Sequence, residues 1–195
     1  PASMPREPFF PDPGSVALPA GGRVPTPNTG AAPKIDASAA ARKLVEQGIA
    51  LRRRGLVEEA AQQYEAAIML APDMVEAHYN LGVARHGQGR LDEAVQCWRK
   101  AVSLRPGFVE ARNNLGTALL EQGFPAEAVQ QHRRALLDNP SSFAALVNLG
   151  NALRQTGEPE QAEASYRHAL AINPEDPSAL ANLGLALQDL ERLDE

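Results

Sequence analysis

The sequence predicts an all-α superhelix, an α-solenoid built from helix–turn–helix repeats, and two observations support that prediction. First, five glycines stand at a single interval of 34 residues: Gly48, Gly82, Gly116, Gly150 and Gly184. Second, an alanine, a ring-bearing residue, another alanine and a proline follow each of the first four glycines at fixed distances. A fixed period of this length indicates structural units that stack on one another.

Each unit should hold two amphipathic helices joined by a tight turn. Glycine suits the end of the first helix because it adopts positive φ readily, and the turn glycines are Gly55, Gly89, Gly123 and Gly157. Proline lacks an N–H group and should end the second helix, at Pro72, Pro106, Pro140 and Pro174. Pro125 suits the start of a helix.

Within a unit, the glycine of Asn-Leu-Gly and the alanine twelve residues later should let two helices approach closely. The aromatic residues Tyr64, Trp98 and Tyr166 are expected to cover the far end of each pair. His132 takes the aromatic position in the third unit. It is expected to be a packed imidazole with one hydrogen bond.

The chain divides into a tail and an array. Residues 1–38 hold more than half of the prolines and should be extended or disordered. Residues 39–195 form the array, with Asp36 or Ser38 capping its first helix and Asp73 capping the third. The repeats run over about 41–74, 75–108, 109–142 and 143–176, with a partial fifth at 177–195. The last residues, Arg192–Glu195, repeat Arg90–Glu93, which predicts that a longer array continues.

Leu-Gly, Ala, an aromatic, Ala and Pro in a 34-residue unit resemble the tetratricopeptide repeat (TPR). The resemblance covers about residues 41–195. It implies a right-handed superhelix whose first helices line a concave groove, where ligands of this family usually bind.

Several polar residues share the face of the first helices that the resemblance assigns to the groove. Residues two before and one after each glycine are i and i+3 neighbours, so they share a face. Asparagine is a poor helix former, so four asparagines at one position of the repeat indicate a role other than helix formation. The candidate peptide-binding residues are Asn80, Asn114, Asn148, Asn182, Tyr79, Asn113, Thr117 and Asn151.

Two interpretations of the asparagine row remain open. An amide can pair with both the N–H and the C=O of an extended peptide, and the row is similar to the asparagine ladder in the TPR region of O-linked N-acetylglucosamine transferases. Alternatively, the amides bridge neighbouring first helices and only stabilise stacking. The clamp that binds the carboxylate tails of large chaperones is incomplete: Val45, Tyr79, Asn113 and Val147 hold its lysine position, although Arg112 and Arg154 lie nearby.

Composition argues against other classes of function. The net charge is −5, which disfavours a general nucleic-acid surface. No apolar run is long enough to span a membrane. His78 and His86 have no acidic or cysteine partners at metal-ligand spacing. No phosphate-binding loop or nucleophile pattern is present, so we predict no catalytic residue, metal or cofactor.

The location is less constrained. The single cysteine, Cys97, excludes an internal disulfide, and no signal peptide is visible. These features leave the compartment open and slightly favour the cytoplasm.

The sequence therefore predicts a scaffold or adaptor that binds an extended peptide or a partner protein in the groove. One alternative is the non-catalytic, substrate-recruiting region of a larger enzyme such as a protein glycosyltransferase. The other is self-association through the tail or through a truncated C-terminal helix.

Overall fold

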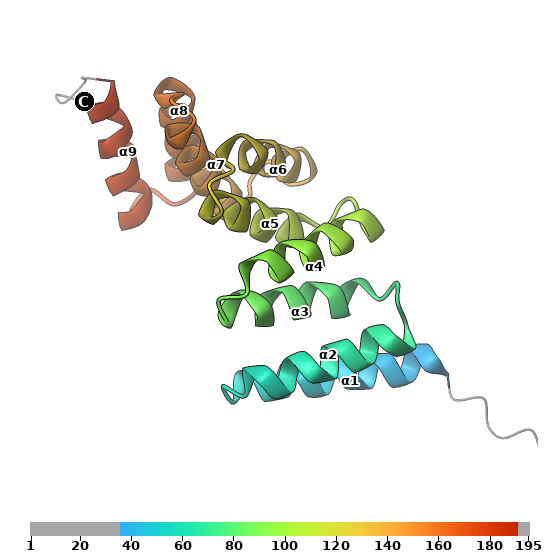
Figure 1. Cartoon of the computed structure of the whole chain (residues 1–195). Helices are drawn as coiled ribbons and strands as arrows, with labels where there is room; N and C mark the ends of the chain where they lie inside the picture. Colours follow the sequence, from blue (N-terminus) through green and yellow to red (C-terminus); the bar gives the residue numbers. More distant parts are fainter. Residues whose placement is uncertain (1–35, 191–195) are drawn as a thin grey trace, which may run out of the picture. The chain divides into compact units, whose positions relative to one another are not determined.

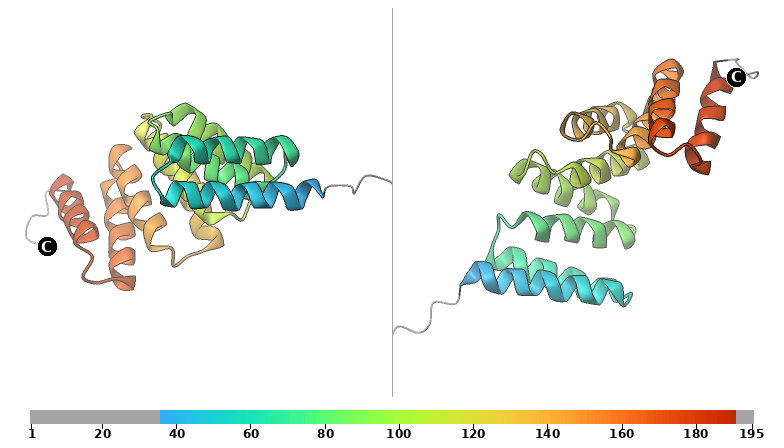
Figure 2. Two further views of the ribbon diagram at one scale, coloured as in Figure 1. Left: turned by 90° about the horizontal axis from the view of Figure 1, so that it is seen from below. Right: turned by 180° about the vertical axis from the view of Figure 1, so that it is seen from behind.

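The computed structural model describes residues 36–190, which form nine α-helices and no strand. The helices are α1 (Ala37–Arg53), α2 (Val57–Leu70), α3 (Val75–Gly87), α4 (Leu91–Leu104), α5 (Val109–Glu121), α6 (Pro125–Asp138), α7 (Phe143–Gln155), α8 (Pro159–Ile172) and α9 (Pro177–Asp189). They follow one another as packed pairs (Figures 1 and 2). The predicted all-α repeat architecture is confirmed. The expectations for residues 1–35 and for Arg192–Glu195 fall outside the described residues.

The helices begin and end where glycine and proline predict. The turn glycines have φ between 73° and 82°, a conformation that L side chains rarely adopt. Each second helix ends two residues before its proline. Pro125 lies in the first turn of α6, where its missing N–H costs nothing.

The helix caps follow the sequence in part. Asp36 caps α1 by accepting a hydrogen bond from the Ser38 backbone N–H at 3.0 Å. The expectation for Asp73 is wrong, because the N-cap of α3 is the next residue, Met74, whose side chain makes no capping hydrogen bond.

The ring-bearing residues lie directly on the glycines. A Cβ placed on Gly48, Gly82, Gly116 or Gly150 would come within 2.5 or 2.6 Å of the ring of Tyr64, Trp98, His132 or Tyr166, respectively. The rings therefore fill the space that a side chain would need at the helix crossing, and they do not cover its far end as expected. Among the described residues, nothing lies within 4 Å of such a Cβ on Gly184 of α9.

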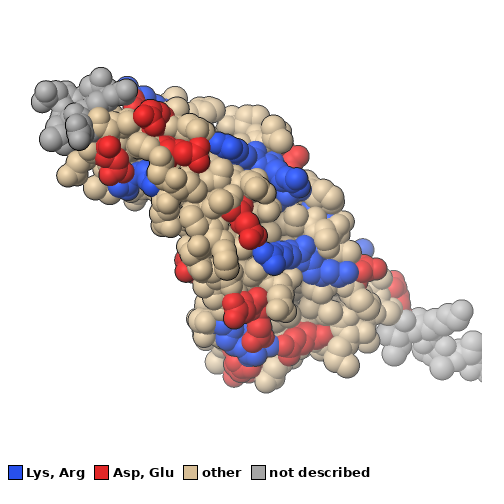
Figure 3. Space-filling model, turned by 45° about the horizontal axis from the view of Figure 1, so that its top comes forward, with Lys and Arg blue, Asp and Glu red and all other residues tan. Residues whose placement is uncertain are grey.

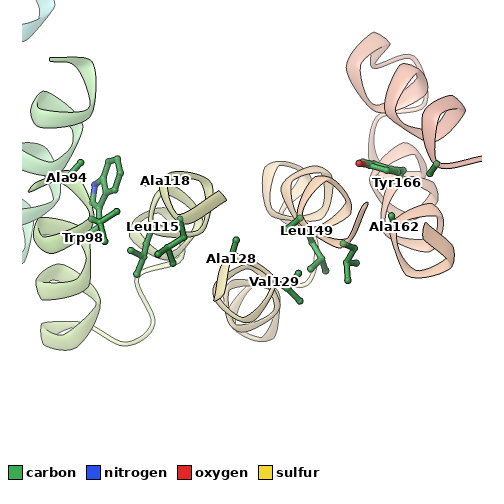
Figure 4. Packing of buried hydrophobic residues seen from close by; sticks show 14 residues of the cluster. Ala94, Trp98, Leu115, Ala118, Ala128, Val129, Leu149, Ala162 and Tyr166 are labelled. Atoms are coloured by element: carbon green, nitrogen blue, oxygen red, sulfur yellow. The ribbon is translucent and has the colours of Figure 1, made fainter. Parts of the chain in front are cut away.

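Buried alanines and leucines fill the spaces between successive helices. Ala94, Ala128 and Ala162 are completely buried, and Leu115 and Leu149 are nearly so. Figure 4 shows these residues with Trp98 of α4 pointing toward the helix that carries Leu115 and Ala118. The core is thus a continuous stack in which each repeat contacts its neighbours.

His132 differs from the expectation. Its ring is completely buried against Gly116, and neither Nδ1 nor Nε2 has a hydrogen-bond partner among residues 36–190. Burial lowers the pKa of His132 to about 4, because a charged imidazole would lose its hydration.

None of the described helices is both long enough and apolar enough to cross a membrane.

Candidate functional site

The first helices of successive repeats form the inner face of the array. α1 contacts α3, α5 contacts α7, and α7 contacts α9, whereas α2, α4, α6 and α8 make no comparable contacts with one another in residues 36–190. Helices that lie closer together are on the inside of a curved stack. We call the surface of α1, α3, α5, α7 and α9 on this side the inner face.

The four asparagines of the row lie in different environments. Asn80 is only 9% exposed, and its Nδ2 group donates to the Glu76 backbone oxygen of its own helix at 2.8 Å. Asn114, Asn148 and Asn182 are half-buried. The four asparagines share one position in the repeat, yet their environments differ, because the residues around each amide do not repeat.

Two of these asparagines bridge neighbouring first helices. Asn148 Nδ2 donates to Asn113 Oδ1 at 3.1 Å and to Thr117 Oγ1 at 3.2 Å, which joins α7 to α5. Asn114 Nδ2 donates to the Tyr79 hydroxyl at 3.4 Å, which joins α5 to α3. Through these hydrogen bonds, both amides help to hold neighbouring repeats together. Contacts of the row with a peptide stay a prediction.

Asn182 and Asn151 lie together at the C-terminal end of the inner face. They line an open hollow of about 390 Å³ with Leu120, Arg154 and Gln155, so that side chains from α5, α7 and α9 meet there. The hydroxyl of Tyr166, from α8, donates to Asn151 Oδ1 at 2.7 Å. The Arg154 Nε group donates to Asp189 Oδ2 at 2.7 Å.

A second hollow, of about 480 Å³, lies at the N-terminal end and is lined by Arg42, Val45, Glu46, Met74, Glu76 and Arg105. Arg105 Nη2 donates to Glu76 Oε1 at 2.5 Å. This hydrogen bond is the main reason that the pKa of Glu76 lies below its usual value. The Arg105 guanidinium lies 5.2 Å from the centroid of the Phe108 ring, within the range of a cation–π contact.

The sequence missed some of these groups. Arg105 and Phe108 come from the segment between α4 and α5, and Tyr166 comes from a second helix, so none has the phase of the asparagine row. Arg112, considered for the groove, points elsewhere: it is buried, and its Nε donates to the Pro106 backbone oxygen at 2.7 Å.

Two further kinds of group were considered in the described residues: the cysteine and possible clusters of metal ligands. Cys97 is half-buried, and burial raises the pKa of its thiol to about 11, so the unreactive thiol form dominates at neutral pH. In the part of the chain that the structure describes, no group of three His, Cys, Asp or Glu side chains could hold a metal ion. Acidic and basic side chains are interspersed on the face shown in Figure 3.

Comparisons with known proteins agree with this architecture. A family model described as tetratricopeptide repeat matches residues 45–107, 113–177 and 148–195. The chain belongs to the tetratricopeptide-repeat family. No curated protein sequence matches it. The repeats of this family form a scaffold that is generally non-catalytic and binds protein or peptide partners, so a general role in protein interaction follows for this TPR chain.

Solved structures show the same fold. A crystal structure of MamA is 24% identical, with a TM-score of 0.75 over 80% of this chain and 85% of that chain. YrrB, described as a TPR protein with an unusual peptide-binding site, is 22% identical, with a TM-score of 0.71 over 78% of each chain. The pilF protein of Pseudomonas aeruginosa is 25% identical, with a TM-score of 0.71 over 80% of this chain and 71% of that chain.

Proposed function

We propose that this TPR array binds an extended segment of a partner protein on its inner face, with side chains of α5, α7 and α9 contacting the main chain of that segment. The observation that carries the proposal is the hollow at the C-terminal end, where Asn151, Gln155 and Asn182 present amides beside Leu120 and Arg154. A smaller hollow of about 120 Å³, lined by Val83, His86, Trp98, Asn114 and Thr117, lies on the same face.

Amides suit this role because an extended peptide presents N–H and C=O groups that its own backbone does not pair. Each amide can donate to one and accept from the other. Asn114 and Asn148 donate through Nδ2 in their bridging bonds, which leaves their Oδ1 atoms to accept from a peptide N–H. The inner face would therefore hold a backbone with little dependence on its side chains.

The proposal is tested by panning a phage-displayed library of random 12-residue peptides against the full chain. Selected peptides are then synthesised and titrated against Asn182→Ala, which removes an amide from the hollow. Loss of one hydrogen bond should weaken binding about threefold to tenfold. The melting temperature should stay nearly unchanged, because no bridging hydrogen bond is lost.

The matched control is Gln130→Ala. Gln130 is an exposed amide on α6, away from the inner face, so its removal should leave binding unchanged. Failure to enrich any peptide, or equal affinity for wild type and Asn182→Ala, would overturn the proposal.

A further inference from the structure

The junction between the second and third repeats differs from the other junctions of the inner face. In residues 36–190, α3 and α5 make no contacts comparable to those of the other neighbouring first helices. The hollow of about 120 Å³ lies between them, and its exposed lining is mostly apolar. Its walls come from three helices: Val83 and His86 of α3, Trp98 of α4, and Asn114 and Thr117 of α5.

The polar side chains around this hollow are paired within the chain. Trp98 Nε1 donates to the Tyr79 backbone oxygen at 3.2 Å, and Thr117 Oγ1 donates to the Asn113 backbone oxygen at 3.1 Å. The Asn114 Nδ2 group donates to the Tyr79 hydroxyl. A polar group that entered the hollow would lose its hydration and find few free partners there, which is unfavourable. An apolar group has no such cost.

An exposed pair spans the gap between the two helices. His86 Nε2 donates to Glu121 Oε2 at 2.9 Å, and the two side chains are 40% and 45% exposed. Exposed pairs of this kind contribute little to stability, so this one can separate at low cost. The rim of the hollow can therefore adjust to an entering side chain, while the buried Trp98 wall stays in place.

We propose that this hollow receives one aliphatic side chain of the bound segment, that of a valine, leucine or isoleucine. The inference rests on the proposed peptide-binding function and names a side chain that the partner must carry. An apolar cavity of about 150 Å³ admits benzene, so a hollow of about 120 Å³ suits one branched aliphatic side chain. The Asn114 Oδ1 atom, which the bond to Tyr79 does not use, can accept a main-chain N–H beside it.

This site would fix the register of the segment. In the next two repeats, Thr117 and Asn151 take the position that Val83 has on α3, so the inner face becomes more polar toward α7 and α9. There the segment is held through its main chain, with little dependence on sequence. One apolar residue that fits only between α3 and α5 would then decide which part of the segment reaches each amide.

The probe is a peptide selected from the random library by panning against the full chain. Each of its positions is replaced in turn by leucine, alanine and asparagine, and binding is measured by fluorescence anisotropy. At one position, leucine should bind roughly tenfold to a hundredfold more tightly than alanine, because its side chain is buried. Asparagine, which is polar, should bind no better than alanine there.

Two substitutions of Val83 change the size of the hollow in opposite directions. Val83→Phe fills it and should remove the preference for leucine. Val83→Ala enlarges it, so the preferred residue at that position should change from leucine to phenylalanine. The matched control is Leu137→Ala, which truncates an aliphatic side chain that is 82% exposed on α6, and it should leave the preference unchanged.

The results separate this site from the proposed function. Peptides that bind equally well with leucine, alanine or asparagine at every position would overturn the apolar site, while peptide binding itself survives. A preference for leucine that both folded Val83 variants retain would overturn it as well. If no peptide binds the wild-type chain, the proposed peptide-binding function fails, and the apolar site fails with it.

Discussion

The third and fourth repeats share one backbone plan but differ at the ring that faces the glycine. In the fourth repeat, Tyr166 packs on Gly150 and its hydroxyl reaches Asn151 on the inner face. In the third repeat, His132 packs on Gly116 in the same way, yet both of its ring nitrogens are buried without partners. The same position thus orients an inner-face amide in one repeat and leaves two buried nitrogens without hydrogen bonds in the other.

The largest expected effect of this difference is a loss of stability in acid that comes from His132. Its pKa is about 4 in the folded chain and about 6.5 when unfolded, so the unfolded state binds more protons between these values. Stability from this group is complete above about pH 6.5 and is lost as the pH falls toward 4, by about 3 kcal/mol.

Urea unfolding between pH 4 and 8 measures this loss. Because carboxylates also titrate in this range, the wild type is compared with His132→Phe. The variant should lose about 3 kcal/mol less over the range, and parallel curves for the two proteins would contradict the buried, neutral imidazole.

Gly116→Val should cost on the order of 1–3 kcal/mol, because overpacking a helix crossing forces the neighbouring ring or backbone to move. The added Cβ would lie 2.6 Å from His132 Cε1. Gly184→Val is the matched control, since no described residue lies within 4 Å of a Cβ at that position. Thermal melts showing equal losses for the two variants would refute the ring-on-glycine packing.

At neutral pH, His132→Phe should stabilise the fold by about 1–2 kcal/mol. The ring shape is nearly kept, while two buried nitrogens without hydrogen bonds are removed. The free energy of unfolding from urea denaturation at pH 7.5 checks this. A destabilised variant would show that the pocket on Gly116 cannot accept the larger ring.

The smallest effect belongs to Tyr166→Phe, which removes the hydroxyl and should cost about 1 kcal/mol of stability. Asn151 then loses the bond that fixes its amide, so peptide binding on the inner face should weaken as well. Tyr64→Phe is the control, because within residues 36–190 the buried Tyr64 hydroxyl has no hydrogen-bond partner and lies near Arg52, not near an inner-face asparagine. Weaker binding by both variants would point to a general loss of order and not to the orientation of Asn151.

Much of the fold follows from residues that repeat. Glycine and proline act through their own backbone geometry, so the turns at Gly55 and its equivalents and the ends of the second helices could be placed without knowing any neighbour. The positions of the rings could not be predicted in this way. Helical phase gives the face of the helix on which a side chain lies, but not the point that the side chain reaches on the next helix. The single hydrogen bond expected for His132 was wrong for the same reason.

The candidate site was less predictable. Asn80 and Asn182 share one phase, but Asn80 is buried against its own helix and Asn182 lines a hollow. That difference comes from residues that do not repeat. From the sequence, Arg154 is only one part of an incomplete clamp. The position of its guanidinium is set by Asp189 of the next repeat and by Tyr166 of the second helix, contacts that the repeat pattern does not reveal.

The most direct test of peptide binding on the inner face is a titration followed by the side-chain amide resonances of a ¹⁵N-labelled chain. One peptide selected from the random library is added in steps, and the asparagine and glutamine NH₂ signals are assigned by substitution. If the peptide binds on the inner face, the signals of Asn151, Gln155 and Asn182 should shift most, while that of Gln130 on α6 stays in place. Shifts confined to the second helices, with the inner-face amides unmoved, would contradict it.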